Sequence, residues 1–200
     1  MSNSKTPNIT ATNTEQQILE AAYRCLAQNG SANVSTRDIA RESGVTLSLI
    51  HYYFPNKEEL LVAAASEAIS REIAALQEEV SPFINLEDRG IACIRFIRRR
   101  FEYEDTKWRK VYFDLLSQAA WSDKIAQQVR RLQDSLVSTI MVGLNETQSD
   151  LNLNAFSRVF LAALNGLALQ FLHHAPKNEL DDAYAFLETT LCSLLQNKKP

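Results

Sequence analysis

The segment from Ser35 to Leu60 carries side chains whose types and spacing suit the binding of nucleic acid. It reads STRDIARESGVTLSLIHYYFPNKEEL, with hydroxyl, imidazole and phenol groups close to a glycine and basic residues on both sides. Groups of this kind donate hydrogen bonds to base edges and phosphates, and basic side chains attract the phosphate backbone. The segment therefore predicts contact with double-stranded DNA.

Two small residues in this segment meet the requirements of a helix-turn-helix. Such a motif needs a small residue where its two helices cross, and Ala40 supplies it. Four residues later it needs a turn that tolerates positive φ, which Gly44 provides. Ile39, Val45 and Ile50 are then the apolar side chains that hold the two helices at their angle.

The rest of the second helix is left facing outward. The amino-terminal ends of both helices aim backbone N–H groups at the DNA backbone, and Thr36 and Arg37 lie at one such end. Among the aromatic residues that follow, we expect Tyr52 to be exposed, Tyr53 to be partly buried and Phe54 to be in the core. The outward residues of the second helix are Thr46, Leu47, Ser48, His51 and Tyr52.

The elements that position this segment are all helices. Helical periodicity dominates the sequence and no alternating run with strand-type turns occurs, so the predicted fold class is all-α. Thr14 and Gln17 form a capping box for the first helix, which Gly30 ends, and Pro55 and Pro82 flank a long fourth helix. Nine helices are expected, at residues 14–30, 35–42, 46–53, 56–80, 86–103, 106–119, 123–144, 154–173 and 179–196.

Composition limits how the chain can bind DNA. Of its 200 residues 46% are hydrophobic, and its net charge of -3 argues against coating nucleic acid through overall positive charge. Residues 1–57 carry +1 and the remainder -4, so any DNA contact must be local. Residues 1–13 are polar and predict a disordered tail, not a secretory signal. Cys25, Cys93 and Cys192 lie among apolar neighbours and indicate free thiols, hence a cytoplasmic location.

The segment from Ile18 to Leu61 resembles the DNA-binding domain of the TetR family of bacterial transcriptional regulators. The resemblance implies that Tyr53 and Lys57 contact phosphates, and it includes Gly44 in the DNA-binding motif. His51 departs from the pattern, because most members have tyrosine there. The residues that match the family motif are Gly44, Val45, Thr46, Ser48, Tyr53, Phe54, Lys57, Glu58 and Leu60.

The resemblance also implies a division into domains. Residues 14–57 form the DNA-binding domain, and residues 58–200 bind a small-molecule effector and form a homodimer. ALNGLALQFL, residues 163–172, is similar to the corresponding helix in the group around the choline-responsive regulator of betaine synthesis.

An apolar stripe around Trp108 and Tyr112 has two interpretations. Apolar residues at helical spacing are typical of a plain core, whereas TetR-family members enclose an effector between the corresponding helices. Both interpretations stay open. The predicted effector-binding residues are Phe96, Arg100, Trp108, Tyr112, Leu116, Leu132, Asn165 and Leu169.

The helix at residues 154–173 is apolar around most of its circumference. Its longest apolar stretch, Val159–Leu172, contains Asn165 and Gln170 and is too short to span a bilayer, so no membrane contact is expected. A helix that is apolar on two faces is buried on both, here against its own domain and against a second copy. The predicted dimer interface comprises Phe156, Phe160, Ala163, Leu167, Phe171, Tyr184, Leu187, Leu191 and Leu194.

Two further clusters have simpler explanations than a binding site. Neighbouring His173 and His174 point about 100° apart on a helix, and no acidic residue or cysteine nearby has ligand spacing, so neither metal nor cofactor is expected. The run Arg98–Arg100 is followed at a spacing of four residues by Glu102 and Glu104, which indicates a solvated, paired face and not a second nucleic-acid patch.

Two rival classes of function remain to be weighed. An enzyme would need a nucleophile elbow, a phosphate loop, a zinc motif or paired carboxylates, and none is recognisable. A helical protein-interaction module would need neither Gly44 nor Lys57 nor the outward polar residues. The sequence therefore predicts a homodimeric TetR-like regulator that binds a palindromic operator and a small effector. Repression is implied by the family majority.

Overall fold

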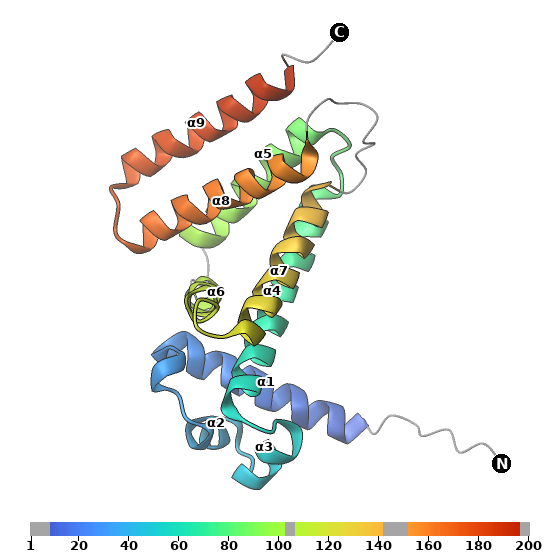
Figure 1. Ribbon diagram of the computed structural model, residues 1–200, viewed down its shortest axis with the longest axis vertical. Helices are drawn as coiled ribbons and strands as arrows, with labels where there is room; N and C mark the ends of the chain where they lie inside the picture. Colours follow the sequence, from blue (N-terminus) through green and yellow to red (C-terminus); the bar gives the residue numbers. More distant parts are fainter. Residues whose placement is uncertain (1–8, 103–106, 142–151, 197–200) are drawn as a thin grey trace, which may run out of the picture. The chain divides into compact units, whose positions relative to one another are not determined.

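The structure, a computed structural model, describes residues 9–102, 107–141 and 152–196. Within these ranges the regular elements are all helical, which confirms the predicted all-α fold (Figure 1). The elements are α1 Ile9–Asn29, the 3-10 turn η1 Ser31–Asn33, α2 Thr36–Ser43, α3 Leu47–Tyr53, α4 Lys57–Val80, α5 Leu86–Glu102, α6 Lys107–Gln118, α7 Asp123–Met141, α8 Leu153–Leu172 and α9 Lys177–Gln196.

The start of α1 differs from the prediction. The helix begins at Ile9, so the expected tail is wrong for residues 9–13, and Thr14 lies inside the helix instead of capping it. Once a helix is nucleated, each further residue adds a hydrogen bond at little cost, so the docked part of α1 can extend beyond its first cap-like residue. Gln17 is used elsewhere, since its Nε2 donates to the Ser43 carbonyl at 2.6 Å. Residues 1–8 and the expected helix ends at 103, 106 and 144 lie outside the described residues.

Hydroxyl residues cap both short helices, as predicted. Ser35 and Asp38 form a reciprocal capping box at the start of α2, and Thr46 accepts a hydrogen bond from the Leu49 N–H at the start of α3. The hydrogen bonds from Ser35 lower the pKa of Asp38, so its carboxylate stays charged at neutral pH. These caps define the helix starts without help from distant parts of the chain.

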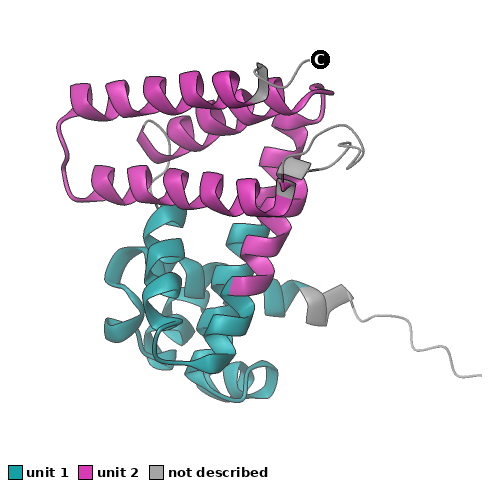
Figure 2. Ribbon diagram, turned by 45° about the horizontal axis from the view of Figure 1, so that its top comes forward, with its two compact units in different colours: residues 1–70, 107–129 teal, residues 71–106, 130–200 magenta. Residues whose placement is uncertain are grey.

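The chain divides into two compact units (Figure 2). Unit 1 extends to Ser70 and includes Lys107–Val129, whereas unit 2 comprises Arg71–Thr106 and the chain from Arg130. In unit 1, α1 packs against α2 and α6. The helices α4 and α7 each contribute to both units. The functional boundary expected at residue 57 stays a prediction.

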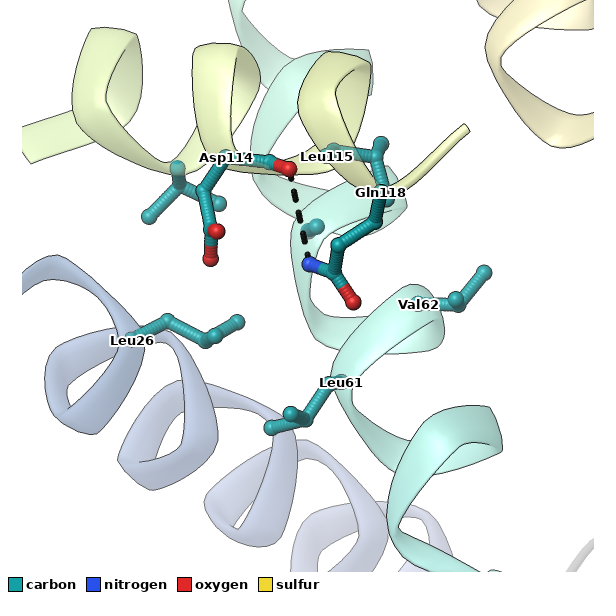
Figure 3. Close-up of a pocket in the computed structure, with 8 residues that line it drawn as sticks. Leu26, Leu61, Val62, Asp114, Leu115 and Gln118 are labelled. Carbon is teal, nitrogen blue, oxygen red and sulfur yellow. Dashed lines mark hydrogen bonds between the residues drawn. The ribbon is translucent and has the colours of Figure 1, made fainter. Parts of the chain in front are cut away.

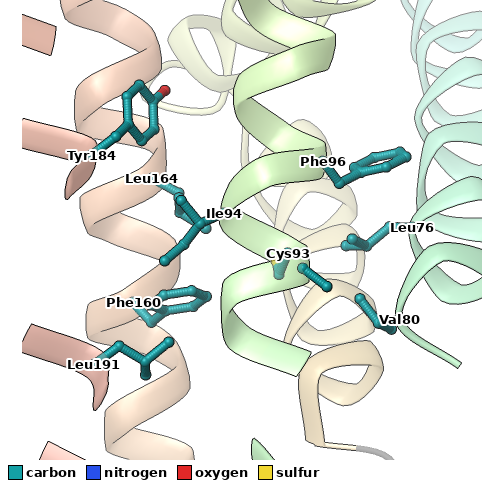
Figure 4. Packing of buried hydrophobic residues seen from close by; sticks show 10 residues of the cluster. Leu76, Val80, Cys93, Ile94, Phe96, Phe160, Leu164, Tyr184 and Leu191 are labelled. Carbon is teal, nitrogen blue, oxygen red and sulfur yellow. The ribbon is translucent and has the colours of Figure 1, made fainter. Parts of the chain in front are cut away.

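Unit 2 has a core in which α5 packs against both α8 and α9 (Figure 4). Gly90 allows the close approach of α9, because a Cβ at this position would lie 2.5 Å from Leu191 Cδ2. Cys93 is fully buried, and burial raises the pKa of its thiol to about 12, so this cysteine stays protonated and unreactive. The core cluster comprises Leu76, Val80, Ala92, Cys93, Ile94, Phe96, Phe160, Leu164, Tyr184 and Leu191.

A buried arginine joins the ends of two helices in unit 2. Arg89 is only 5% exposed. Its guanidinium donates to the carbonyls of Val80 and Phe83 at 3.3 and 3.1 Å and to that of Thr139 at 2.7 Å. The last carbonyls of a helix have no partner within the helix, so a buried cation at this point satisfies groups that would otherwise be costly to bury. These hydrogen bonds therefore explain why the charged side chain of Arg89 is buried.

The helix α8 is longer than the apolar stretch on which the sequence analysis relied. By length and composition, Asn154–Leu172 is able to cross a membrane, and 28% of that window is buried inside the structure. A core helix of a water-soluble protein passes the same test. The inner face of α8 does enter the core of unit 2, through Phe160, Leu164 and Ala168.

The turn at Gly44 generates a stability prediction. Its φ of 71° is left-handed, and no atom lies within 4 Å of a Cβ placed there, so a substitution strains only the backbone. We expect Gly44→Ala to lower the free energy of unfolding by about 1 kcal/mol, and Gly44→Asn to lower it less because asparagine tolerates this conformation. Urea denaturation of the three proteins measures this. Equal stability of Gly44→Ala and the native protein would contradict it.

Candidate nucleic-acid interface

The helix-turn-helix predicted from the sequence is present in unit 1. Gly44 ends α2 with φ 71° and ψ 15°, a left-handed conformation that turns the chain into α3. On either side of the turn, Ile39 and Ile50 are completely buried, and Val45 is half-buried. These side chains hold α2 and α3 together, as expected from their positions in the sequence.

The opposite side of α3 is open to solvent. Tyr52 is 80% exposed, with its ring edge-on to that of Tyr53 at 5.2 Å, whereas Phe54 is buried. This order of exposure confirms the expectation for the three aromatic residues. Thr46, Ser48 and His51 are also exposed, while Leu47 and Tyr53 are half-buried. The predicted base-reading residues therefore lie at an accessible surface, although the hydroxyl of Thr46 also caps α3.

The charges around the motif are partly neutralised within unit 1. Arg24 Nε lies 2.7 Å from Glu42 Oε1, and Arg41 Nη2 lies 2.9 Å from Asp38 Oδ1.

Two other basic side chains near the motif are not neutralised in this way among the described residues. Arg37 is exposed in the first turn of α2, and Lys57 is half-buried as the first residue of α4. Among the described residues neither of them forms an ion pair. Both stand at a helix amino terminus, where backbone N–H groups add to the attraction of an anion.

The helix α6 and the start of α7 also contact the motif region, which the sequence analysis did not predict. The backbone N–H and the Oγ of Ser31 donate to the carboxylate of Asp114 at 2.8 and 2.9 Å. Ser122 Oγ donates to Glu58 Oε1 at 2.8 Å, and Lys124 Nζ lies 2.7 Å from Glu59 Oε1. These partners are 64 to 83 residues apart, so no local pattern could have indicated them.

A small pocket lies between α1, α4 and α6 in unit 1 (Figure 3). Its size suits a water molecule and not an organic effector. None of the predicted effector-binding residues lines it. The lining residues are Leu26, Leu61, Val62, Ala65, Val111, Asp114, Leu115 and Gln118.

The predicted effector-binding residues are divided between the two units. Trp108, Tyr112 and Leu116 lie on α6 in unit 1, and the other five belong to unit 2. That all eight line one pocket stays a prediction.

Two of these residues have surroundings that bear on an effector. Phe96 is part of the unit 2 core. Arg100 forms an ion pair with Glu72, with Nε 2.7 Å from Glu72 Oε2. Its expected partner, Glu104, lies outside the described residues. The pairing expected for Arg98 with Glu102 is confirmed, at 3.3 Å, but the expected solvation is wrong there, because the Glu102 side chain is only 2% exposed.

The residues predicted for the dimer interface differ in exposure. Phe160, Tyr184 and Leu191 lie inside the unit 2 core, whereas Leu194 is 49% exposed. The remaining predicted residues, Phe156, Ala163, Leu167, Phe171 and Leu187, are half-buried.

Sequence reasoning omitted the most exposed apolar side chains of these two helices. Val159 on α8 is 70% exposed and Phe186 on α9 is 74% exposed. The signal was present in the spacing of one apolar stripe on α8, formed by Ala155, Val159, Ala162, Gly166 and Leu169.

Comparison with known proteins agrees with this geometry. Residues 18–64 match the family model described as bacterial regulatory proteins, tetR family. The transcriptional regulator BetI of Brucella suis is 27% identical over 174 residues, covering 84% of this chain and 83% of the relative. The nicotine-responsive transcriptional repressor HdnoR of Paenarthrobacter nicotinovorans is 24% identical over 176 residues, covering 82% and 86%.

Solved structures share the fold. A Streptomyces coelicolor regulator has a TM-score of 0.74 at 19% identity, covering 90% of this chain and 97% of the other. A Saccharomonospora viridis regulator, crystallised in complex with choline, has a TM-score of 0.71 at 22% identity, covering 89% and 95%.

The family match coincides with the part of the chain that has the geometry of a DNA-reading module. Residues 18–64 run from within α1 through α2 and α3 into the first turns of α4, and so include Gly44, the exposed face of α3 and Lys57. The relatives that align over most of the chain are transcriptional regulators and not enzymes. This chain is therefore a DNA-binding helix-turn-helix transcriptional regulator whose residues 18–64 match the TetR family.

Proposed function

We propose that this regulator is a cytoplasmic repressor that binds a palindromic operator as a homodimer and is released by a small organic effector. The observation that carries the proposal is the exposed polar face of α3, which is flanked by two cations without an ion pair among the described residues, Arg37 and Lys57. Exposed polar groups on a recognition helix read base edges, and cations at its borders hold phosphates.

The first test separates phosphate contacts from base contacts. We expect Lys57→Ala to weaken binding to all duplexes and to reduce the slope of log affinity against log salt by about one, because one phosphate contact is lost. Ser48→Ala is expected to change base preference with little change in that slope. Fluorescence anisotropy with a duplex selected from a random library by the native protein measures both effects.

Arg41→Ala is the matched control for Lys57→Ala. It removes the same charge, but from a guanidinium already paired with Asp38 at 2.9 Å. We therefore expect a smaller loss of affinity than for Lys57→Ala. The phosphate role of Lys57 would be refuted by unchanged affinity and salt dependence in Lys57→Ala.

The dimer is supported by the apolar surface that α8 and α9 leave uncovered. Val159, Leu169, Phe186 and Leu194 are exposed side chains of these two helices, which pack against each other. Small and apolar residues recur along the outer face of α8 at helical spacing, a pattern that suits the face of a second helix. Two copies related by a two-fold axis would present two α3 helices to a palindromic site.

The dimer is tested by adding charge to this surface. Native protein is expected to have twice the chain mass of 22.6 kDa by light scattering at micromolar concentration. Phe186→Glu is expected to shift it toward the monomer, since each copy would bury an unpaired charge. Ile84→Glu is the control, because Ile84 is 87% exposed in the α4–α5 turn and belongs to neither α8 nor α9. A native monomer would contradict the dimer.

The effector we propose is a small, mostly apolar organic cation. Support comes from the choline in the Saccharomonospora viridis structure and from the nicotine response in the name of HdnoR, since choline is a quaternary ammonium ion and nicotine has a tertiary amine that takes up a proton. Aromatic faces attract such cations, and the rings of Trp108 and Tyr112 lie 6.3 Å apart on α6. Arg100 gives little support to an anionic effector, because Glu72 already balances its charge.

Titration of the protein–duplex complex with choline and with nicotine tests the effector. We expect one of them to reduce affinity for the selected duplex by about 5- to 150-fold in the native protein, as is usual for coupled sites, and to have no effect in Trp108→Ala. Trp121→Ala is the matched control, because Trp121 is 90% exposed. If Trp108→Ala responded like the native protein, the effector site would not include Trp108.

A further inference from the structure

Two contacts from one distant segment flank the DNA-reading helices. The helices α2 and α3 occupy the chain between Thr36 and Tyr53. Ser31, before α2, is bound by Asp114 of α6. Glu58 and Glu59, after α3, are bound by two residues at the start of α7. We call the segment Asp114–Lys124 the α6–α7 corner; all of it belongs to unit 1 together with α2 and α3.

The first contact fixes the chain just before α2. Ser31 is 8% exposed, and both its N–H and its Oγ donate to the two carboxylate oxygens of Asp114. A carboxylate that accepts two hydrogen bonds in a partly buried place holds its partner more firmly than a neutral acceptor does. Figure 3 shows the Asp114 carboxylate directed from α6 toward α1. Only three residues separate Ser31 from Ser35, the cap of α2, so the start of α2 is held in place.

The second contact fixes the first turn of α4. Asn56 caps this helix by accepting from the Glu59 N–H at 2.9 Å, and Lys124 Nζ lies 2.7 Å from the Glu59 carboxylate. The hydrogen bond from Lys124 is the largest cause of the lowered pKa of Glu59, so the pair is charged at neutral pH. Lys57, the predicted phosphate contact, belongs to this same turn.

We propose that Asp114, Ser122 and Lys124 are positioning residues for DNA binding. The α6–α7 corner holds both flanks of the helix-turn-helix at a fixed separation, so that α3 and Lys57 meet base edges and phosphate together. Neither contact needs to touch DNA. The inference rests on the proposed operator binding, and it adds to the DNA-reading module a third component that lies more than 50 residues further along the chain.

Two explanations of the role of Asp114, positioning of the reading helices and long-range charge, predict opposite changes in DNA affinity. Asp114→Asn removes a negative charge, so long-range electrostatics alone would tighten binding to DNA. Positioning predicts the reverse, a weakening of about fivefold, which is of the order of the net contribution of one ordinary hydrogen bond. Glu15→Gln is the control, because Glu15 is exposed on α1 in the same unit, lies outside the corner and loses the same charge. Affinity for the selected duplex is measured by anisotropy, and folding by thermal unfolding.

Lys124 is tested with a conservative rescue. Lys124→Gln is expected to weaken binding about fivefold more than Lys110→Gln, which removes the same charge from an exposed position of α6. Lys124→Arg should restore affinity, because it keeps the ion pair with Glu59. The salt slope should fall by about one in Lys124→Gln, as Lys57 loses its phosphate contact. A merely structural role would change the unfolding temperature without changing this slope.

The double variant Asp114→Asn/Lys124→Gln tests whether the corner acts as one unit. The two residues are ten positions apart and share no partner, so their effects on unfolding free energy should add. Their effects on operator affinity should not add, because losing either flank already releases the reading helices. Additive losses of affinity would overturn the single-unit proposal. Should Asp114→Asn fail to fold, Ser31→Ala tests the same flank with no change of charge.

Two further results would overturn the inference, and they distinguish failure of the corner from failure of the proposed operator binding. Equal affinity of Asp114→Asn and Glu15→Gln, or of Lys124→Gln and Lys110→Gln, would show that the corner does not position the reading helices. If the native protein retained no duplex from the random library, the proposed operator binding itself would fail, and the corner would fail with it.

Discussion

The left-handed turn at Gly44 is the constraint on which the DNA-reading surface depends. With φ at 71°, this residue lets α2 and α3 cross with Ile39 and Ile50 completely buried between the helices and the rest of unit 1. A helix of seven residues such as α3 has too few internal hydrogen bonds to be stable alone, so its orientation comes from this packing. The exposure of Ser48, His51 and Tyr52 is a consequence of which side is buried.

Electrostatics then selects which residues around that surface can hold DNA. The acidic residues near the motif reduce its positive charge, because Glu42 and Asp38 pair with Arg24 and Arg41. A chain with a net charge of -3 needs local cations to attract DNA, and Arg37 and Lys57, at two helix amino termini, form no ion pair within the part of the chain that the structure describes. The carboxylates of α4's first turn are occupied by the α6–α7 corner, which keeps negative charge engaged with protein donors beside Lys57.

The sequence could predict those features that depend on interactions between residues close together in the chain. The bounds of α2, α3 and α4, the caps at Ser35 and Thr46 and the buried faces of these helices depend on residues three or four apart, and these predictions agree with the structure to within one residue. The ion pair of Arg98 with Glu102 was predictable for the same reason. Arg100 pairs with Glu72 across 28 residues, and Asp114 with Ser31 across 83, so only the folded chain brings them together. The predicted start of α1 was wrong because a threonine that caps a helix is indistinguishable in sequence from one inside it.

The two faces of α8 show how far an apolar pattern can be interpreted. Periodicity predicted a helix with two apolar faces, but not which residues serve which face, because Phe160 and Val159 are both apolar and differ only in direction. The structure places Phe160 in the core with α5 and leaves Val159 70% exposed. A lipid environment for the outer face would also have to accept Arg158, which is exposed and paired with Asp134 at 3.0 Å. Arg158 is the fifth residue of the apolar window Asn154–Leu172, and taking such an ion pair out of water carries a desolvation cost that the polar rim of a protein interface avoids. The outer face of α8 therefore fits a second protein surface better than it fits lipid.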